Sequence, residues 1–84
     1  RDIERLVSGL SEVYQKAIQK FNAKPEECII FEDSLIGIEA AKKAGIETIA
    51  IYDKYSDADT EAIKAQADFY LHDYTELLSS IDEL

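Results

Sequence analysis

Three short apolar runs, separated by segments with helical periodicity, restrict the fold of this chain more than any other feature. The clearest run is residues 28–31, Cys-Ile-Ile-Phe, and residues 48–52 and 69–71 supply the other two. Short runs bounded by turn-forming residues favour strands, and a run that is apolar at every position is typical of a strand covered on both faces. The three runs therefore predict three strands in one small sheet.

Helical periodicity occupies the intervals between these strands. It covers residues 11–21, a segment from about residue 35 to the glycine at 45, a short segment near residues 58–67 and a last one near residues 74–84. Ser11 is placed to cap the first helix, while Asp73 and Glu76 have the spacing of a capping box for the last. The first ten residues are ambiguous between a helix and a strand.

Turn-forming residues separate the predicted elements. Asn22 tolerates a left-handed conformation after the first helix, and Pro25 blocks continuation of that helix. Gly45 takes the left-handed position after the second helix, which would cost other residues about 1 kcal/mol. Strands that alternate with helices are joined by right-handed crossovers, and such crossovers produce a parallel sheet. The predicted fold class is therefore α/β.

The balance of charge limits the partners that this chain can have. Eighteen acidic residues against nine basic ones give a formal net charge of −9, which disfavours nucleic acid and anionic membranes and attracts divalent cations. The single cysteine, Cys28, excludes an internal disulfide and fits a reducing compartment. No apolar run is long enough to span a membrane, and the start of the sequence lacks the apolar core of a signal peptide. We therefore expect a soluble, cytoplasmic protein that binds neither nucleic acid nor membranes.

An acidic pair, Glu32 and Asp33, follows the first predicted strand and precedes a helix. Ligands of open α/β sheets bind beyond the carboxyl ends of the strands, and this pair lies at that edge. A structural alternative remains open, because Asp33 or Ser34 is a favoured N-cap and a helix N-terminus stabilises negative charge. A single cap leaves one carboxylate without a role, and adjacent carboxylates repel each other unless a cation or a donor compensates. Mg²⁺, which takes one or two carboxylates together with waters and phosphate oxygens, would use both charges.

The segment KPEECIIFEDSLIGIEAAKKAGIETIAI, together with EVYQKAI before it, resembles the C-terminal half of the core domain of the haloacid dehalogenase-like hydrolases. Within that superfamily it is most similar to the phosphoglycolate phosphatase and β-phosphoglucomutase-like branch. The most specific elements are the apolar strand that ends in EDS and the GIEAAKKAG that follows it. The resemblance implies a Rossmann-like three-layer core, of which residues 1–84 would be a single partial domain with a short parallel sheet of about three strands and flanking helices.

The resemblance also implies a Mg²⁺-dependent phosphatase or phosphomutase. Such an enzyme would act on a small phosphomonoester, for example a sugar phosphate, through an aspartyl-phosphate. Asp33 would be a direct or water-mediated metal ligand, and Glu32 would be the second ligand or its orienter. Ser34 would cap the helix and contact the metal shell. From its position just beyond the second strand, Asp53 is a further candidate on the same rim.

The sequence departs from the family's pattern at the catalytic nucleophile. The only Asp-x-Asp-x-Thr lettering runs from Asp57 to Thr60, but it follows a polar turn and opens a helix, so we interpret its acids as helix-capping residues. Ser8 stands where relatives carry a phosphate-binding lysine, and neither the Ser/Thr motif nor the cap domain of the family is evident. We expect the isolated chain to be inactive, and either to need the missing half of the core or to self-associate through the exposed edge of its first strand.

Two other functions remain open. A non-catalytic α/β interaction module, or a remnant of an enzyme, would keep the acidic pair only as a helix cap. A receiver-like signalling domain also gathers carboxylates at strand ends, but it needs a phosphoacceptor aspartate after a central strand and a lysine late in the chain, and neither is evident. His72 is the only histidine, which excludes a histidine-based metal site or catalytic triad.

Overall fold

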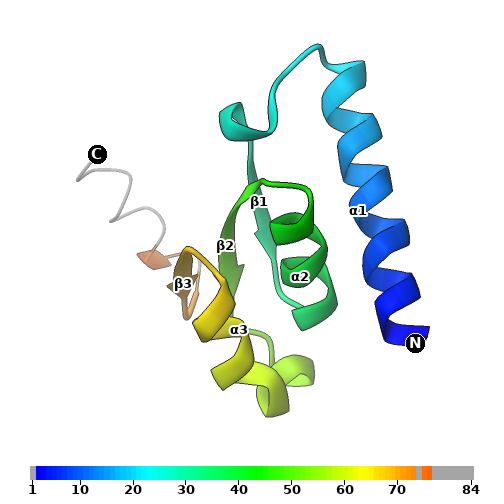
Figure 1. Ribbon diagram of the computed structural model, residues 1–84. Coiled ribbons are helices and arrows are strands. Elements are labelled where there is room, and N and C mark those ends of the chain that lie inside the picture. The colour runs from blue at the N-terminus through cyan, green and yellow to red at the C-terminus, as the bar shows by residue number, and fades with distance from the viewer. Residues whose placement is uncertain (1, 74, 77–84) are drawn as a thin grey trace.

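The computed structural model describes residues 2–73, 75 and 76, and it places helices beside a three-stranded parallel sheet (Figure 1). In chain order the elements are α1 (Asp2–Lys20), the 3₁₀ helix η1 (Pro25–Glu27), β1 (Ile29–Glu32), α2 (Leu35–Lys43), β2 (Glu47–Ile51), the 3₁₀ helix η2 (Lys54–Asp59), α3 (Thr60–Gln66) and β3 (Phe69–Leu71). The strand order is β1-β2-β3, and both pairings are parallel. The structure therefore confirms the α/β class and the short parallel sheet. None of the described helices is long and apolar enough to cross a membrane.

The register of the strands sorts their side chains onto two faces. One cross-strand row consists of Phe31, Ile49 and Phe69, and the next consists of Glu32, Ala50 and Tyr70. Because side chains alternate along a strand, these two rows point to opposite faces of the sheet. The row that contains Glu32 faces the helices, since Ala50 and Tyr70 pack with residues of α2 and α3.

The side chains of α2 form the centre of the core. Ile38, Ala40 and Ala41 are completely buried. Ala41 packs against Ile18 of α1, and Ile38 packs against Ile63 of α3 and against β2. The three α-helices therefore lie on the same face of the sheet, with α1 towards the β1 side and α3 towards the β3 side (Figure 1). The helix α2 therefore has α1 on one flank and α3 on the other.

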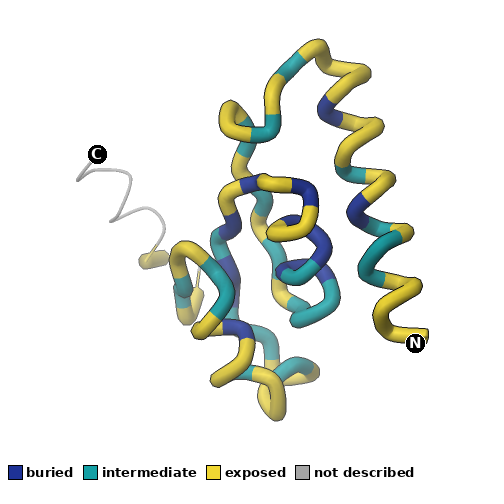
Figure 2. The backbone as a smooth tube through the Cα atoms, viewed as in Figure 1, coloured by how far each residue is buried: buried dark blue, intermediate teal, exposed yellow. Residues whose placement is uncertain are grey.

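The opposite face of the sheet carries exposed apolar side chains. Ile29, Phe31 and Phe69 are 55%, 46% and 55% exposed, and β1 alternates between exposed and partly buried positions along its length (Figure 2). The sequence predicted that this strand is covered on both faces. Within the described residues that prediction is wrong, because all the helices that pack near β1 lie on one side of it. β1 is also an edge strand, with β2 as its only neighbour in the sheet.

The first helix is longer than the sequence predicted, and the ambiguous first segment belongs to it. Ser11, predicted to cap this helix, lies in its middle and is only 1% exposed. Its hydroxyl accepts a hydrogen bond from Gln15 Nε2 at 3.2 Å. The prediction of the cap was wrong because a serine is also small enough to lie in a tight contact between helices, and α1 packs along α2.

Both predicted left-handed turns are confirmed. Asn22 has φ = 56° after α1, and Gly45 has φ = 78° after α2. The predicted final helix, residues 74–84, falls almost entirely outside the described residues. Its capping box is formed nonetheless: the Glu76 backbone N–H donates to Asp73 Oδ1 and the Asp73 backbone N–H donates to Glu76 Oε1, each at 3.2 Å.

Candidate functional site

The acidic pair lies at the carboxyl end of β1, where the chain turns sharply into α2. Glu32 is the last residue of the strand, Asp33 is the connecting residue and Ser34 is the N-cap of the helix. The Ser34 hydroxyl accepts a hydrogen bond from the backbone N–H of Gly37 at 3.1 Å. The sequence left the cap open between Asp33 and Ser34, and the structure assigns it to Ser34. The Asp33 carboxylate is therefore not needed to start the helix.

The Glu32 carboxylate is turned back onto the turn that it precedes. Its Oε1 accepts hydrogen bonds from the backbone N–H groups of Asp33 at 3.0 Å and Ser34 at 3.3 Å, and from the Ser34 hydroxyl at 3.3 Å. Its Oε2 accepts a hydrogen bond from the Tyr14 hydroxyl of α1, also at 3.3 Å. Hydrogen-bond donors therefore compensate the negative charge of Glu32. Compensation by donors is one of the two ways, the other being a bound cation, in which the repulsion between adjacent carboxylates can be relieved.

Gly37, one turn into α2, leaves the space that this carboxylate occupies. A Cβ atom at position 37 would overlap Cγ, Cδ and Oε2 of Glu32. From the sequence we expected Gly37 to allow close packing of the helix on the sheet. The structure shows that the group packed against Gly37 is the side chain of Glu32, at the end of β1.

Tyr14 connects α1 to the acidic turn and was not recognised as a site residue from the sequence. Its side chain is partly buried, and burial, followed by the charge of Glu32 and the hydrogen bond to it, raises the pKa of the Tyr14 phenol above its ordinary value. The helical spacing placed Tyr14 on the packed face of the first helix. Nothing in that spacing indicated that its hydroxyl would reach a residue 18 positions away.

Asp33 differs from Glu32 in both exposure and bonding. It is exposed, and its carboxylate forms no hydrogen bond or ion pair with any of the described residues. A shallow hollow of about 160 Å³ opens beside it, lined by Phe31, Glu32, Asp33 and Ile51. The hollow lies at the carboxyl ends of β1 and β2, which is the edge at which open α/β sheets bind their ligands.

The donor set at this edge suits a hard, partly hydrated cation. It offers two carboxylates, of which that of Asp33 forms no hydrogen bond with the described residues, and no histidine or cysteine sulfur. Within the part of the chain that the structure describes, no three metal-binding side chains come together. Mg²⁺ fits this arrangement, since it commonly takes one or two carboxylates and completes its octahedron with waters and phosphate oxygens. The described residues do not supply enough ligands for a metal site that is closed by protein side chains alone.

Asp53 lies on the predicted rim, at the carboxyl end of β2, but its side chain is engaged. Its Oδ2 accepts a hydrogen bond from the Tyr55 backbone N–H at 3.0 Å and caps η2. Asp57, in the Asp-x-Asp-x-Thr lettering, accepts a hydrogen bond from the Tyr52 hydroxyl at 2.9 Å. Asp53 therefore caps the local turn, and Asp57 lies in the first turn of η2. The capping role that the sequence predicted for the acids of this lettering is wrong for their side chains, because Asp57 bonds the Tyr52 hydroxyl and the Asp59 side chain makes no capping hydrogen bond.

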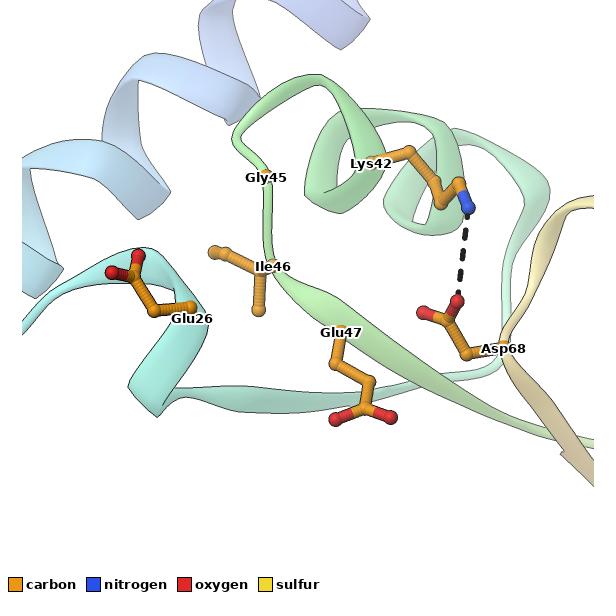
Figure 3. Close-up of a pocket in the computed structure, with 6 residues that line it drawn as sticks. All are labelled: Glu26, Lys42, Gly45, Ile46, Glu47 and Asp68. Atoms are coloured by element: carbon orange, nitrogen blue, oxygen red, sulfur yellow. Dashed lines mark ion pairs between the residues drawn. The ribbon is translucent and has the colours of Figure 1, made fainter.

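A second hollow, of about 390 Å³, lies at the other end of the sheet (Figure 3). Its lining residues are Glu26, Lys42, Gly45, Ile46, Glu47 and Asp68. Lys42 Nζ lies 3.9 Å from Asp68 Oδ1 across it. These residues precede or begin the strands, so the hollow faces away from the acidic turn and shares no residue with it. It is not the ligand edge of the sheet.

Asp68 has a structural role beside this hollow. Its Oδ2 accepts hydrogen bonds from the Thr48 backbone N–H at 2.8 Å and from the Thr48 hydroxyl at 3.2 Å, and its own N–H donates to that hydroxyl at 3.1 Å. The Thr48 N–H is the main cause that lowers the pKa of Asp68, and Lys42 adds to it while burial opposes it. The reciprocal hydrogen bonds between Thr48 and Asp68 join the starts of β2 and β3. No pattern in the sequence indicates this contact.

Comparison with known proteins gives one family match and several individual relatives. The model of the haloacid dehalogenase-like hydrolase family matches residues 8–51, which include the acidic turn. Glyceraldehyde 3-phosphate phosphatase of Pyrococcus furiosus is 34% identical over 83 residues, which cover 96% of the chain and 34% of that protein. Validoxylamine A 7'-phosphate phosphatase of Streptomyces hygroscopicus subsp. limoneus is 41% identical over 66 residues, 79% of the chain and 29% of that protein.

A third relative matches a shorter segment. The phosphorylated carbohydrates phosphatase of Thermotoga maritima is 50% identical over 38 residues, 45% of the chain and 18% of that protein. The chain thus spans about a third or less of the length of the curated relatives that it matches. No solved structure matches the chain at a significant level.

Proposed function

The chain belongs to the haloacid dehalogenase-like hydrolase family, and on that basis we propose that it is the metal-binding part of a Mg²⁺-dependent phosphohydrolase. The observation that carries the proposal is the unbonded Asp33 carboxylate at the carboxyl edge of the sheet, beside a hollow. The substrate would be a small phosphomonoester. The names of the relatives support that class, since they are phosphatases of glyceraldehyde 3-phosphate and of phosphorylated carbohydrates.

Each residue of the acidic turn has a distinct part in this proposal. Asp33 would hold the cation directly or through water. Glu32 would orient the turn, because its oxygens already accept four hydrogen bonds whose donors compensate its charge, and Ser34 would cap α2. Bound Mg²⁺ would neutralise and align the phosphoryl group for transfer. The aspartate that receives the phosphoryl group would come from another segment of the enzyme.

The partner in this proposal is the remaining half of the family's core, placed along the free edge of β1. α2 leads from β1 to β2, and α1 lies on the same face but on the other flank of α2 (Figure 1). With the usual right-handed crossover, a parallel strand that leads into α1 belongs beyond β1 and not beyond β3. Both α1 and β1 carry exposed apolar residues, namely Leu6, Val13, Ile29 and Phe31.

The assignment of Asp33 is tested in the full-length protein by Asp33→Ala. Mg²⁺-dependent hydrolysis of p-nitrophenyl phosphate should fall by at least about 100-fold, since charge stabilisation by a metal contributes several kcal/mol to such a transition state. Asp59→Ala is a matched control, because Asp59 is exposed and its side chain makes no capping hydrogen bond. An Asp33→Ala protein with wild-type activity would refute the proposal.

The competing function is a non-catalytic interaction module, and the Ser34 cap is the observation that favours it. In that case the acidic turn is complete without a ligand, because Ser34 and Glu32 already satisfy the backbone donors. Addition of Mg²⁺ should then leave the amide resonances of Ser34 and Leu35 in place. A working metal site should move both resonances in a saturable manner.

A further inference from the structure

Glu32 is held from two directions by elements that are distant in sequence. From α1, the Tyr14 hydroxyl donates to Oε2, and from the turn itself two backbone N–H groups and the Ser34 hydroxyl donate to Oε1. Tyr14 is the only one of these donors that lies outside the turn. Without it, the donors to Glu32 that the structure records would all reach the same oxygen.

Gly37 restricts the same carboxylate by shape. Because position 37 has no side chain, Cδ and Oε2 of Glu32 lie against the backbone of α2. Any larger residue would require the carboxylate to leave this space, and Glu32 also lines the hollow beside Asp33. The glycine and the tyrosine therefore act on the same group, one by making room for it and the other by binding it.

We propose that Tyr14 and Gly37 are positioning residues that keep the Glu32 carboxylate folded against α2, so that Asp33 alone presents its carboxylate to the cation. The inference rests on the proposed function for its metal, but its geometric part concerns only residues of this chain. Release of Glu32 would leave a second, mobile carboxylate beside the hollow that both residues line, and would withdraw hydrogen bonds from the backbone that carries Asp33. Residues that orient metal ligands typically contribute about 10-fold to 100-fold to metal affinity.

The test uses full-length protein with Tyr14→Phe, which removes one hydroxyl and little volume. Tyr52→Phe is the matched control, because its hydroxyl also donates to a carboxylate, but to that of Asp57 and not to Glu32. The first measurement needs no metal. The amide resonances of Asp33 and Ser34, whose N–H groups donate to Glu32, should shift in Tyr14→Phe and stay in place in Tyr52→Phe.

The second measurement is the binding of Mn²⁺ alone, followed by electron paramagnetic resonance of the free ion. Tyr14→Phe should weaken Mn²⁺ binding by about 10-fold while Tyr52→Phe leaves it unchanged. Gly37→Ala displaces Glu32 with the Tyr14 hydroxyl still present, and it should shift the same two amides and weaken Mn²⁺ binding in the same direction. This second variant decides the question if Tyr14→Phe fails to fold.

The outcomes separate this inference from the proposed function. If Tyr14→Phe and Gly37→Ala leave the two amides and the Mn²⁺ affinity at their wild-type values, the positioning role is wrong while the metal site stands. If wild-type protein binds no Mn²⁺, or Asp33→Ala binds it as well as wild type does, the proposed function is wrong. The metal part of the inference is then wrong with it.

Discussion

Replacement of Gly37 by alanine should destabilise the protein, although the same change in most helices is stabilising. A glycine inside a helix costs roughly 0.5–1 kcal/mol relative to alanine, so the backbone alone favours the substitution. At position 37, however, the new methyl group would overlap the Glu32 carboxylate. Forced repacking of this kind typically costs about 1–3 kcal/mol.

The displaced carboxylate also loses hydrogen bonds. Each is worth about 0.5–1.5 kcal/mol net, and Glu32 is only partly buried, so water recovers part of the loss. Together the terms predict that Gly37→Ala lowers the free energy of unfolding by about 1–3 kcal/mol. Urea unfolding measures this as a lower midpoint with an unchanged slope.

A double-mutant cycle with Glu32→Ala isolates the cause. In the Glu32→Ala background no carboxylate fills the space, so Gly37→Ala should be neutral or stabilising by up to about 1 kcal/mol. Gly9→Ala in α1 is the matched control, because a Cβ there would meet no atom within 4 Å and should simply stabilise the helix. The reasoning fails if Gly37→Ala stabilises wild-type protein as Gly9→Ala does, or if it destabilises both backgrounds equally.

Three further outcomes are expected. Asp68→Ala should lower stability at neutral pH; because the folded-state pKa of Asp68 is lowered, the difference from wild type should shrink as pH falls below the ordinary value of 3.8. Gly45→Ala should cost about 1 kcal/mol in urea unfolding although the new Cβ would make only an ordinary contact with Pro25 Cβ at 3.8 Å, since φ is 78° there. The 84-residue chain alone should self-associate at micromolar concentration in light scattering, and Phe31→Lys on its open face should reduce this; a monomer before substitution contradicts the argument.

Much of the fold could be predicted because its signals are local. Asn22 and Gly45 mark helix ends through their own backbone preferences, and both adopt the expected left-handed conformation. The run that begins at Cys28 marked β1 to within one residue. Ser11 was misassigned because its small size suits a helix cap and a helix contact equally, and only the position of α2 decides between them.

The site could be predicted in part for the same reason. Glu32 and Asp33 were recognised as a pair because they are adjacent in sequence, and the strand before them placed both at the ligand edge. The hydrogen bond that holds the second oxygen of Glu32 comes from Tyr14, which reaches Glu32 only after α1 has packed beside α2. A contact between residues 18 positions apart follows from tertiary packing, which periodicity does not specify.

The order of the strands has a consequence for how this chain folds. Paired residues are always close along the chain, with Ile29 beside Glu47 and Ile49 beside Phe69, separations of 18 and 20 residues. Loops of that length close at a modest entropic cost, and topologies built from such near neighbours fold quickly. The sheet can therefore grow one strand at a time in the order of synthesis. Among the described residues its first strand, β1, keeps an unpaired edge throughout, which is the edge where we propose that the other half of the core pairs.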